Sequence, residues 1–252
     1  MKKIISLFFL LVLISCNDKK QESESDNTLK IDTIQALNEV ISTEDEPKEA
    51  QKLAVNYAEH KEILDVLTII PDSTMPSWGW KPNERKDFVK FIAQNNVTPD
   101  TSKNFSKIVS IKPNTLKIQV VDGSWVLSIY KIKADHYIVI TDDMVGDGNE
   151  ILAFEYDKGQ LKYIKLKEVF GDYFSSLLVD KNNVKCNELL EENKIGFEYD
   201  FDSETAVEIS NSFYLKENEN KDCFNGNTLL FQFNKTSKKF DLVKKYWSNP
   251  KE

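Results

Sequence analysis

The chain has 252 residues, of which 40% are hydrophobic and 29% charged, and its formal net charge is −8 at pH 7. This length can bury a sizeable core, as one large domain or two small ones. The acidic balance lacks the basic surface that nucleic-acid binding requires, and the eight glycines form no glycine-rich phosphate loop.

The first fifteen residues have the layout of a secretory signal peptide. Lys2 and Lys3 form a short positive region, and an apolar stretch follows over residues 4–14. This stretch is too short to span a bilayer, which takes ~20 residues. We therefore expect residues 1–15 to be removed, which takes two lysines away and changes the net charge from −8 to −10.

The apolar stretch ends at Cys16, and the four residues Leu13-Ile14-Ser15-Cys16 resemble the lipobox of bacterial lipoproteins. The resemblance implies that Cys16 is lipidated and becomes the first residue of the mature protein. Several acyl chains, palmitate among them, would give stable anchoring to a membrane. The expected location is the cell envelope, at the outer membrane, on its periplasmic face or at the cell surface. The alternative is an ordinary signal peptide with a chance cysteine.

A polar segment follows the cysteine. Residues 16–30 carry charged side chains and almost no large apolar ones, so they cannot bury enough surface to fold. We expect a disordered tether. Its acidic tract loosely resembles the surface-export signals of Bacteroidota lipoproteins.

Helical periodicity extends over residues 31–96. Apolar residues recur on one helical face from Ile31 to Ile41, and again from Ala50 to Tyr57. A third helix is expected after Pro82, capped by Asn83. These helices are expected to pack against a sheet and to have no chemical role.

The stretch over residues 69–96 is rich in proline and tryptophan. Its Pro71-Asp72-Ser73 and Asn83-Glu84-Arg85-Lys86-Asp87-Phe88 segments resemble an uncharacterised family of Bacteroidota envelope proteins, over residues 65–165. Ile70 and Lys90 depart from that family's pattern, and the family implies a fold but no activity. Trp78 and Trp80 are candidates for ligand-facing aromatics, although a place in the core is the commoner role of tryptophan.

From residue 115 the apolar period changes to two, which predicts strands. Alternating runs are separated by turn residues, including Asp122-Gly123 and Asp157-Lys158-Gly159. Runs such as WVLSIY are apolar on both faces and should be central. The predicted fold class is α+β, with N-terminal helices packed on an extended antiparallel β meander.

The loop over residues 141–150 offers hard oxygen ligands close together, of the kind that calcium prefers. Asp and Gly are also what a hairpin turn needs, and the spacing is not that of an EF-hand. The candidate calcium ligands are Asp142, Asp143, Asp147, Asn149 and Glu150. If calcium is absent here, no cofactor is expected.

Strands are expected to resume at residue 195, over 195–201, 205–215, 228–233 and 240–246. The hairpin at residues 153–165 resembles the one at 230–244, and each follows a Gly-Asn pair. This similarity suggests two related sheet halves, over residues 107–166 and 175–246, within a β-rich region of 107–246. The alternative is a chance likeness of amphipathic hairpins. The folded body is expected over residues 31–252.

The run FEYDFD over residues 197–202 alternates cleanly and places Glu198, Asp200 and Asp202 in one acidic row. The simplest interpretation of this acidic row is a strand face exposed to solvent. The functional alternative is a contact surface for a cationic partner. Carboxylates at this spacing could also serve a glycosidase.

The two cysteines beyond the signal region, Cys186 and Cys223, form an even pair in an exported protein, which suggests a disulfide. Two unlinked core thiols are the alternative. The two histidines, His60 and His136, form no catalytic arrangement with serine or cysteine that the sequence reveals.

The sequence thus favours a non-catalytic, lipid-anchored envelope protein that binds a protein or a glycan, and no nucleic acid. The candidate partner-binding residues are Trp78, Trp80, Glu198, Asp200 and Asp202. An envelope hydrolase with a carboxylate-based site, or a calcium-dependent structural module, are the alternatives.

Overall fold

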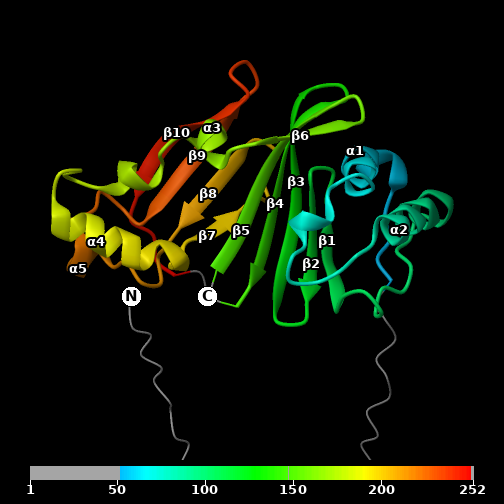
Figure 1. Cartoon of the computed structure of the whole chain (residues 1–252), viewed down its shortest axis with the longest axis horizontal. Helices are drawn as coiled ribbons and strands as arrows, with labels where there is room; N and C mark the ends of the chain where they lie inside the picture. The colour runs from blue at the N-terminus through cyan, green and yellow to red at the C-terminus, as the bar shows by residue number, and fades with distance from the viewer. Residues whose placement is uncertain (1–51, 147, 251–252) are drawn as a thin grey trace, which may run out of the picture. The chain divides into compact units, whose positions relative to one another are not determined.

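The computed structural model describes residues 52–146 and 148–250, which form a mixed α+β fold with two antiparallel sheets (Figure 1). The predicted cleavage site, Cys16, the expected tether and the expected helix over Ile31–Ile41 lie outside the described residues. The helix expected from Ala50 to Tyr57 is wrong over its described part, because Ala54 forms a bridge with Val97 and the first described helix begins only at Tyr57. The first sheet is a six-stranded meander in sequence order. Its strands are β1 (Lys107–Ile111), β2 (Thr115–Val120), β3 (Gly123–Lys133), β4 (His136–Val145), β5 (Gly148–Asp157) and β6 (Gln160–Ile164).

Tight turns set the register of this meander. Asp157 pairs with Gln160, so Lys158 and Gly159 form a two-residue turn, and both have a positive φ, of 48° and 86°. This confirms the predicted turn, since hairpins favour such residues. The turn between β2 and β3 lies one residue earlier than expected, because Val120 pairs with Gly123 and leaves Val121 and Asp122 as the turn residues.

Both faces of the first sheet are covered. On one face, which we call the helix face, Ile118, Trp125 and Val139 share a core with α1 (Tyr57–Leu67) and α2 (Pro82–Asn95). On the other, the inter-sheet face, Val126 and Ile140 share a core with the second sheet. Central strands covered on two sides need apolar residues on both faces. This explains why β3 and β4 carry apolar residues on both faces.

The second sheet has the order β10-β9-β8-β7. Its strands are β7 (Glu198–Asp200), β8 (Ala206–Ser210), β9 (Thr228–Asn234) and β10 (Lys239–Tyr246). Short helices precede or join them, namely α3 (Leu166–Phe170), η2 (Phe174–Leu177), α4 (Val184–Asn193), η3 (Lys194–Gly196) and α5 (Glu217–Asn220). Two of the expected strands are therefore shorter than the sequence suggested, because η3 takes residues 194–196 and β8 ends at Ser210.

A disulfide joins Cys186 of α4 to Cys223, which lies between α5 and β9, as the even cysteine pair predicts. It closes a segment with a sequence separation of 37, which contains η3, β7, β8 and the loop after β8. Cross-linking a loop of this size stabilises a fold by restricting the unfolded chain.

The irregular segment between α1 and α2 is held by Arg85, the chain's single arginine, whose side chain is only 1% exposed. Its guanidinium donates to the backbone carbonyls of Leu67, Ile70 and Trp80 and to the carboxylate of Asp72. The 3₁₀ turn η1 (Asp72–Thr74) lies in this segment. Arg85 thus joins the two segments that carry the family resemblance.

Helix α2 begins at Pro82, with Lys81 as its N-cap, so the expected cap at Asn83 is wrong. Pro82 fits the first helical position because its missing N–H would have no partner there. Instead, the Glu84 carboxylate accepts a hydrogen bond from the Lys81 backbone N–H at 2.9 Å. None of the helices described between residues 52 and 250 is long and apolar enough to cross a membrane.

Candidate functional site

A hollow of about 520 Å³ opens where the β4–β5 hairpin meets η3, β7 and the loop after β8. A smaller hollow of about 220 Å³ continues along β7. Glu198 lines both, so we treat them as one groove, called the β7 groove. The larger part is lined by Met144, Gly146, Gly148, Asn149, Ile195, Gly196, Phe197, Glu198, Phe213 and Tyr214.

Asn149, which lines the larger part of the groove, is fixed by a buried carboxylate behind it. Asp142 of β4 is 4% exposed, and both of its oxygens accept from Nδ2 of Asn149 on β5, at 3.0 and 2.9 Å. An ionised carboxylate only accepts hydrogen bonds, so the Asn149 amide nitrogen must face Asp142. The Asn149 amide oxygen is thereby turned the other way, and no described residue donates a hydrogen bond to it. Asn149 itself lines the groove, so the pair fixes an amide at its wall.

Burial raises the pKa of Asp142 to about 6, although the hydrogen bond from Asn149 acts in the opposite direction and lowers it. Nearby Asp143 raises the pKa further, and Lys117 lowers it. Asp142 is therefore ionised at neutral pH and becomes protonated in mild acid. Burial also raises the pKa of Tyr199, whose hydroxyl lies 2.8 Å from the hydroxyl of Tyr173.

Two exposed aromatic rings form the rim of the groove. Phe213 is 65% exposed and Tyr214 57% exposed, and their ring centroids lie 4.9 Å apart in an edge-to-face arrangement. Ile195, 59% exposed, borders the same hollow. The three side chains together form an exposed apolar cluster beside the hollow.

The Tyr214 ring is held in place by the backbone that it packs against. It lies directly against Gly196, where an added Cβ would come within 2.4 Å of ring atom Cδ2. The loop that carries the rings is tied down by buried Asn211, whose amide donates to the carbonyl of Asn193 and accepts from the Tyr214 N–H. The rings are thus presented on a braced loop.

The predicted acidic row lies along the smaller part of the groove. Glu198, Asp200 and Asp202 are all exposed, while Phe197 and Phe201 are buried, as the alternation predicts. The row is partly neutralised, because Lys112 pairs with Asp202 at 2.9 Å and Lys117 lines the same hollow. This lowers its attraction for a cationic partner.

The structure separates the candidate calcium ligands. Asp142 and Asp143 are neighbours in a strand and point to opposite faces, and Asp143 accepts from the Ser77 hydroxyl at 2.6 Å on the helix face. Glu150 pairs with Asp143 across the strands, and Asp147 lies outside the described residues. Among residues 52–146 and 148–250, no three His, Cys, Asp or Glu side chains gather in a group that could hold a metal ion.

The two tryptophans lie on the helix face, away from the acidic row. Trp80 is 3% exposed and packs edge-to-face against Phe88 and Phe105. Trp78, partly buried, packs against Phe105 and Trp125. The structure therefore does not bring the tryptophans and the acidic row into one site.

Comparison with known proteins adds little. No protein-family model matches the chain, and no curated protein matches it. A solved structure described as a domain of an uncharacterized protein from Porphyromonas gingivalis W83 is similar to it, with a TM-score of 0.43 and 14% sequence identity, over 75% of this chain and 98% of that one. A likeness of this strength identifies neither a family nor a function.

Proposed function

We propose that the protein is a lipid-anchored envelope protein, held by Cys16 to the outer membrane, that binds a glycan in the β7 groove without acting on it chemically. One observation carries the proposal. The exposed rings of Phe213 and Tyr214 and the fixed side-chain amide of Asn149 line one open hollow of about 520 Å³.

Sugar rings have an apolar C–H face and hydroxyl groups at their edges. Aromatic rings suit the first, and fixed acceptors suit the second. Phe213 and Tyr214 supply apolar area at low cost in side-chain entropy, since each has two side-chain torsions. Asn149 and Glu198 supply the acceptors. A few placed polar groups beside apolar surface are typical of binding sites for small molecules.

A binding role agrees better with this geometry than hydrolysis does. A carboxylate hydrolase would present two acids to the substrate. Asp142, the desolvated acid nearby, does not line the hollow, and both of its oxygens accept from Asn149, which does. We therefore assign Asp142 the role of positioning Asn149.

We also propose, as expected from the sequence, that the layer of helices begins near residue 31 and that the two sheets are related halves. Supporting it, the similar hairpins β5–β6 and β9–β10 each place their second strand at the edge of a sheet.

The anchor is tested by expression of the full chain and of Cys16→Ser in a bacterium that processes lipoproteins. Wild type should enter the membrane fraction and incorporate a clickable palmitate analogue, and the variant should do neither. A Cys16→Ser protein that stays membrane-bound would contradict the anchor.

The groove is tested with soluble tetrasaccharides of glucose, xylose and N-acetylglucosamine, by calorimetry on the mature chain without its lipid. We expect at least one to bind, and Tyr214→Ala to weaken that binding about tenfold, which corresponds to ~1.4 kcal/mol. Tyr163→Ala is the matched control, since Tyr163 is 56% exposed on β6. Cleavage of the sugar during incubation would show a hydrolase instead, and binding of a peptide but of no sugar would show a protein-binding site.

A further inference from the structure

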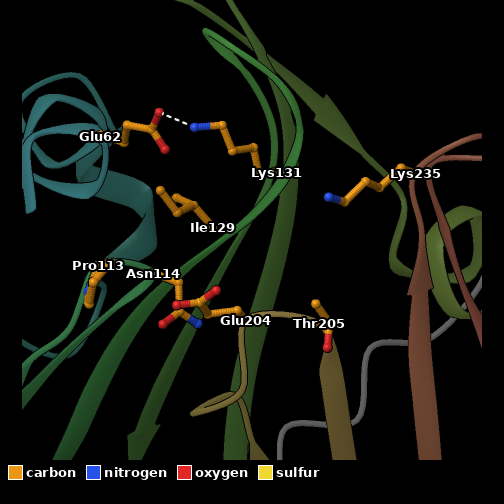
Figure 2. A pocket seen from close by; sticks show the side chains of 8 residues that line it. All are labelled: Glu62, Pro113, Asn114, Ile129, Lys131, Glu204, Thr205 and Lys235. Atoms are coloured by element: carbon orange, nitrogen blue, oxygen red, sulfur yellow. Dashed lines mark hydrogen bonds and ion pairs between the residues drawn. The ribbon is translucent and has the colours of Figure 1, made fainter. Parts of the chain in front are cut away.

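A second hollow, of about 250 Å³, lies apart from the β7 groove and shares no lining residue with it (Figure 2). It forms where α1, the β1–β2 turn, β3, the segment before β8 and the β9–β10 turn meet. Its lining residues are Glu62, Pro113, Asn114, Ile129, Lys131, Glu204, Thr205 and Lys235. The volume is below the ~300–1,000 Å³ typical of sites for drug-sized ligands, so a smaller ligand is expected.

A buried amide in this hollow lacks a partner. Asn114 is 7% exposed, and its backbone carbonyl accepts from the N–H of Ile129 at 2.8 Å. Its side-chain Nδ2 is shielded from water and has no acceptor in the described structure. Buried donors are normally satisfied, so this one calls for an explanation. The last torsion of asparagine is broad, and a small rotation would turn the amide toward a ligand on the pocket floor.

The charges around the hollow balance. Glu62 and Lys131 form an ion pair across one end, and Figure 2 shows Lys235 reaching in from the second sheet. Lys235 and Glu204 are exposed, and neither has an ion-pair partner among the residues that the structure describes. Two carboxylates and two ammonium groups sum to zero, which favours a ligand with both charges over one with a net charge.

We infer that this pocket binds a small zwitterion with a carboxylate and an ammonium group, such as a free amino acid or a dipeptide. Its carboxylate lies between the Lys235 ammonium and the Asn114 amide, so that it supplies the acceptor that Nδ2 lacks. Its ammonium group faces Glu204. The side chain of Ile129, which lines the same pocket, contacts the ligand's carbon skeleton.

The test is calorimetry with L-alanyl-L-alanine, with succinate as a dianion and 1,4-diaminobutane as a dication. We expect the dipeptide to bind and the other two to bind at least about tenfold more weakly. Lys235→Ala and Glu204→Gln should each weaken dipeptide binding about tenfold. Lys239→Ala and Glu192→Gln are the controls, since both residues are exposed and outside the pocket.

All four variants change exposed side chains, and their melting temperatures should match that of the wild type. Dipeptide binding that survives both pocket variants, succinate binding of equal strength, or no binding of the dipeptide would each overturn the inference. Tyr214→Ala should leave dipeptide binding unchanged, so the result is independent of the glycan proposal.

Discussion

Replacing Arg85 by lysine tests how the segment between α1 and α2 is held. The guanidinium satisfies three backbone carbonyls and one carboxylate from a buried position. One of these carbonyls belongs to Leu67, the last residue of α1, where helix carbonyls lack intrahelical partners. Lysine keeps the charge but has a compact ammonium group in place of a planar fork of five donors.

The lysine variant should leave about two of the carbonyls without a donor. A buried acceptor left unpaired costs ~1–3 kcal/mol, so we expect Arg85→Lys to lower the free energy of unfolding by about 3 kcal/mol. For a domain of this size, that lowers the melting temperature by ~6–12 °C. The measurement is urea unfolding followed by circular dichroism.

Asp72→Asn is the matched control for this variant. The Asp72 side chain is 68% exposed, and an asparagine keeps an acceptor for Arg85, so the loss should stay below ~1 kcal/mol. An Arg85→Lys protein within ~0.5 kcal/mol of wild type would refute the reasoning, since the carbonyls would then be satisfied in another way.

Three further predictions follow from particular contacts. The double variant Cys186→Ser/Cys223→Ser should lose ~4 kcal/mol of unfolding free energy for a closed loop of this length, and equal denaturation midpoints with and without the disulfide would contradict this. In the folded protein the pKa of Asp142 is about 6, above its ordinary value of 3.8. Between these two pH values the folded protein binds more protons at Asp142 than the unfolded chain does, so the contribution of Asp142 to stability falls as pH rises through that window. Relative to Asp142→Asn, the free energy of unfolding of the wild type should therefore fall by up to ~3 kcal/mol between pH 4 and 7, as measured by urea titrations. Parallel pH profiles of the two proteins would show that the carboxyl is not desolvated. Chelation with EDTA should leave the melting temperature unchanged, because Asp142 and Asp143 point to opposite faces of the sheet, and a fall that calcium reverses would restore the predicted calcium site.

Strand periodicity made the first sheet predictable. Runs in β3 and β4 with apolar residues on both faces indicated central strands covered on two sides, and residues such as Trp125 and Val139 are 0% exposed. Cysteine count likewise predicted the disulfide between Cys186 and Cys223. Both predictions rest on local or compositional signals that do not depend on how distant segments meet.

Helix α4 was missed although its signals are present. Asn183 caps it by accepting from the N–H of Cys186, and Cys186, Leu189 and Leu190 follow at helical spacing. The expectation of a strand-rich repeat over 175–246 concealed this pattern. The roles of Arg85 could not be read from the sequence, because its carbonyl partners are the end of α1 at Leu67 and the aperiodic segment that contains Ile70 and Trp80.

The aromatic rim was missed because residues 205–215 were read as one strand. Adjacent Phe213 and Tyr214 would point to opposite faces of a strand. The preceding Asn211 is the available signal, since asparagine side chains accept from the backbone two or three residues on and so favour turns. The structure shows this contact, from the Tyr214 N–H to the Asn211 amide oxygen.

The most direct test of the central claim is the affinity of Gly196→Ala for the tetrasaccharide that binds the wild type. The added methyl group would collide with the Tyr214 ring and displace it, while the ring itself remains in the chain. We predict an affinity loss of about tenfold, matching Tyr214→Ala. Unchanged affinity in both variants, with the fold intact by circular dichroism, would contradict a glycan site in the β7 groove.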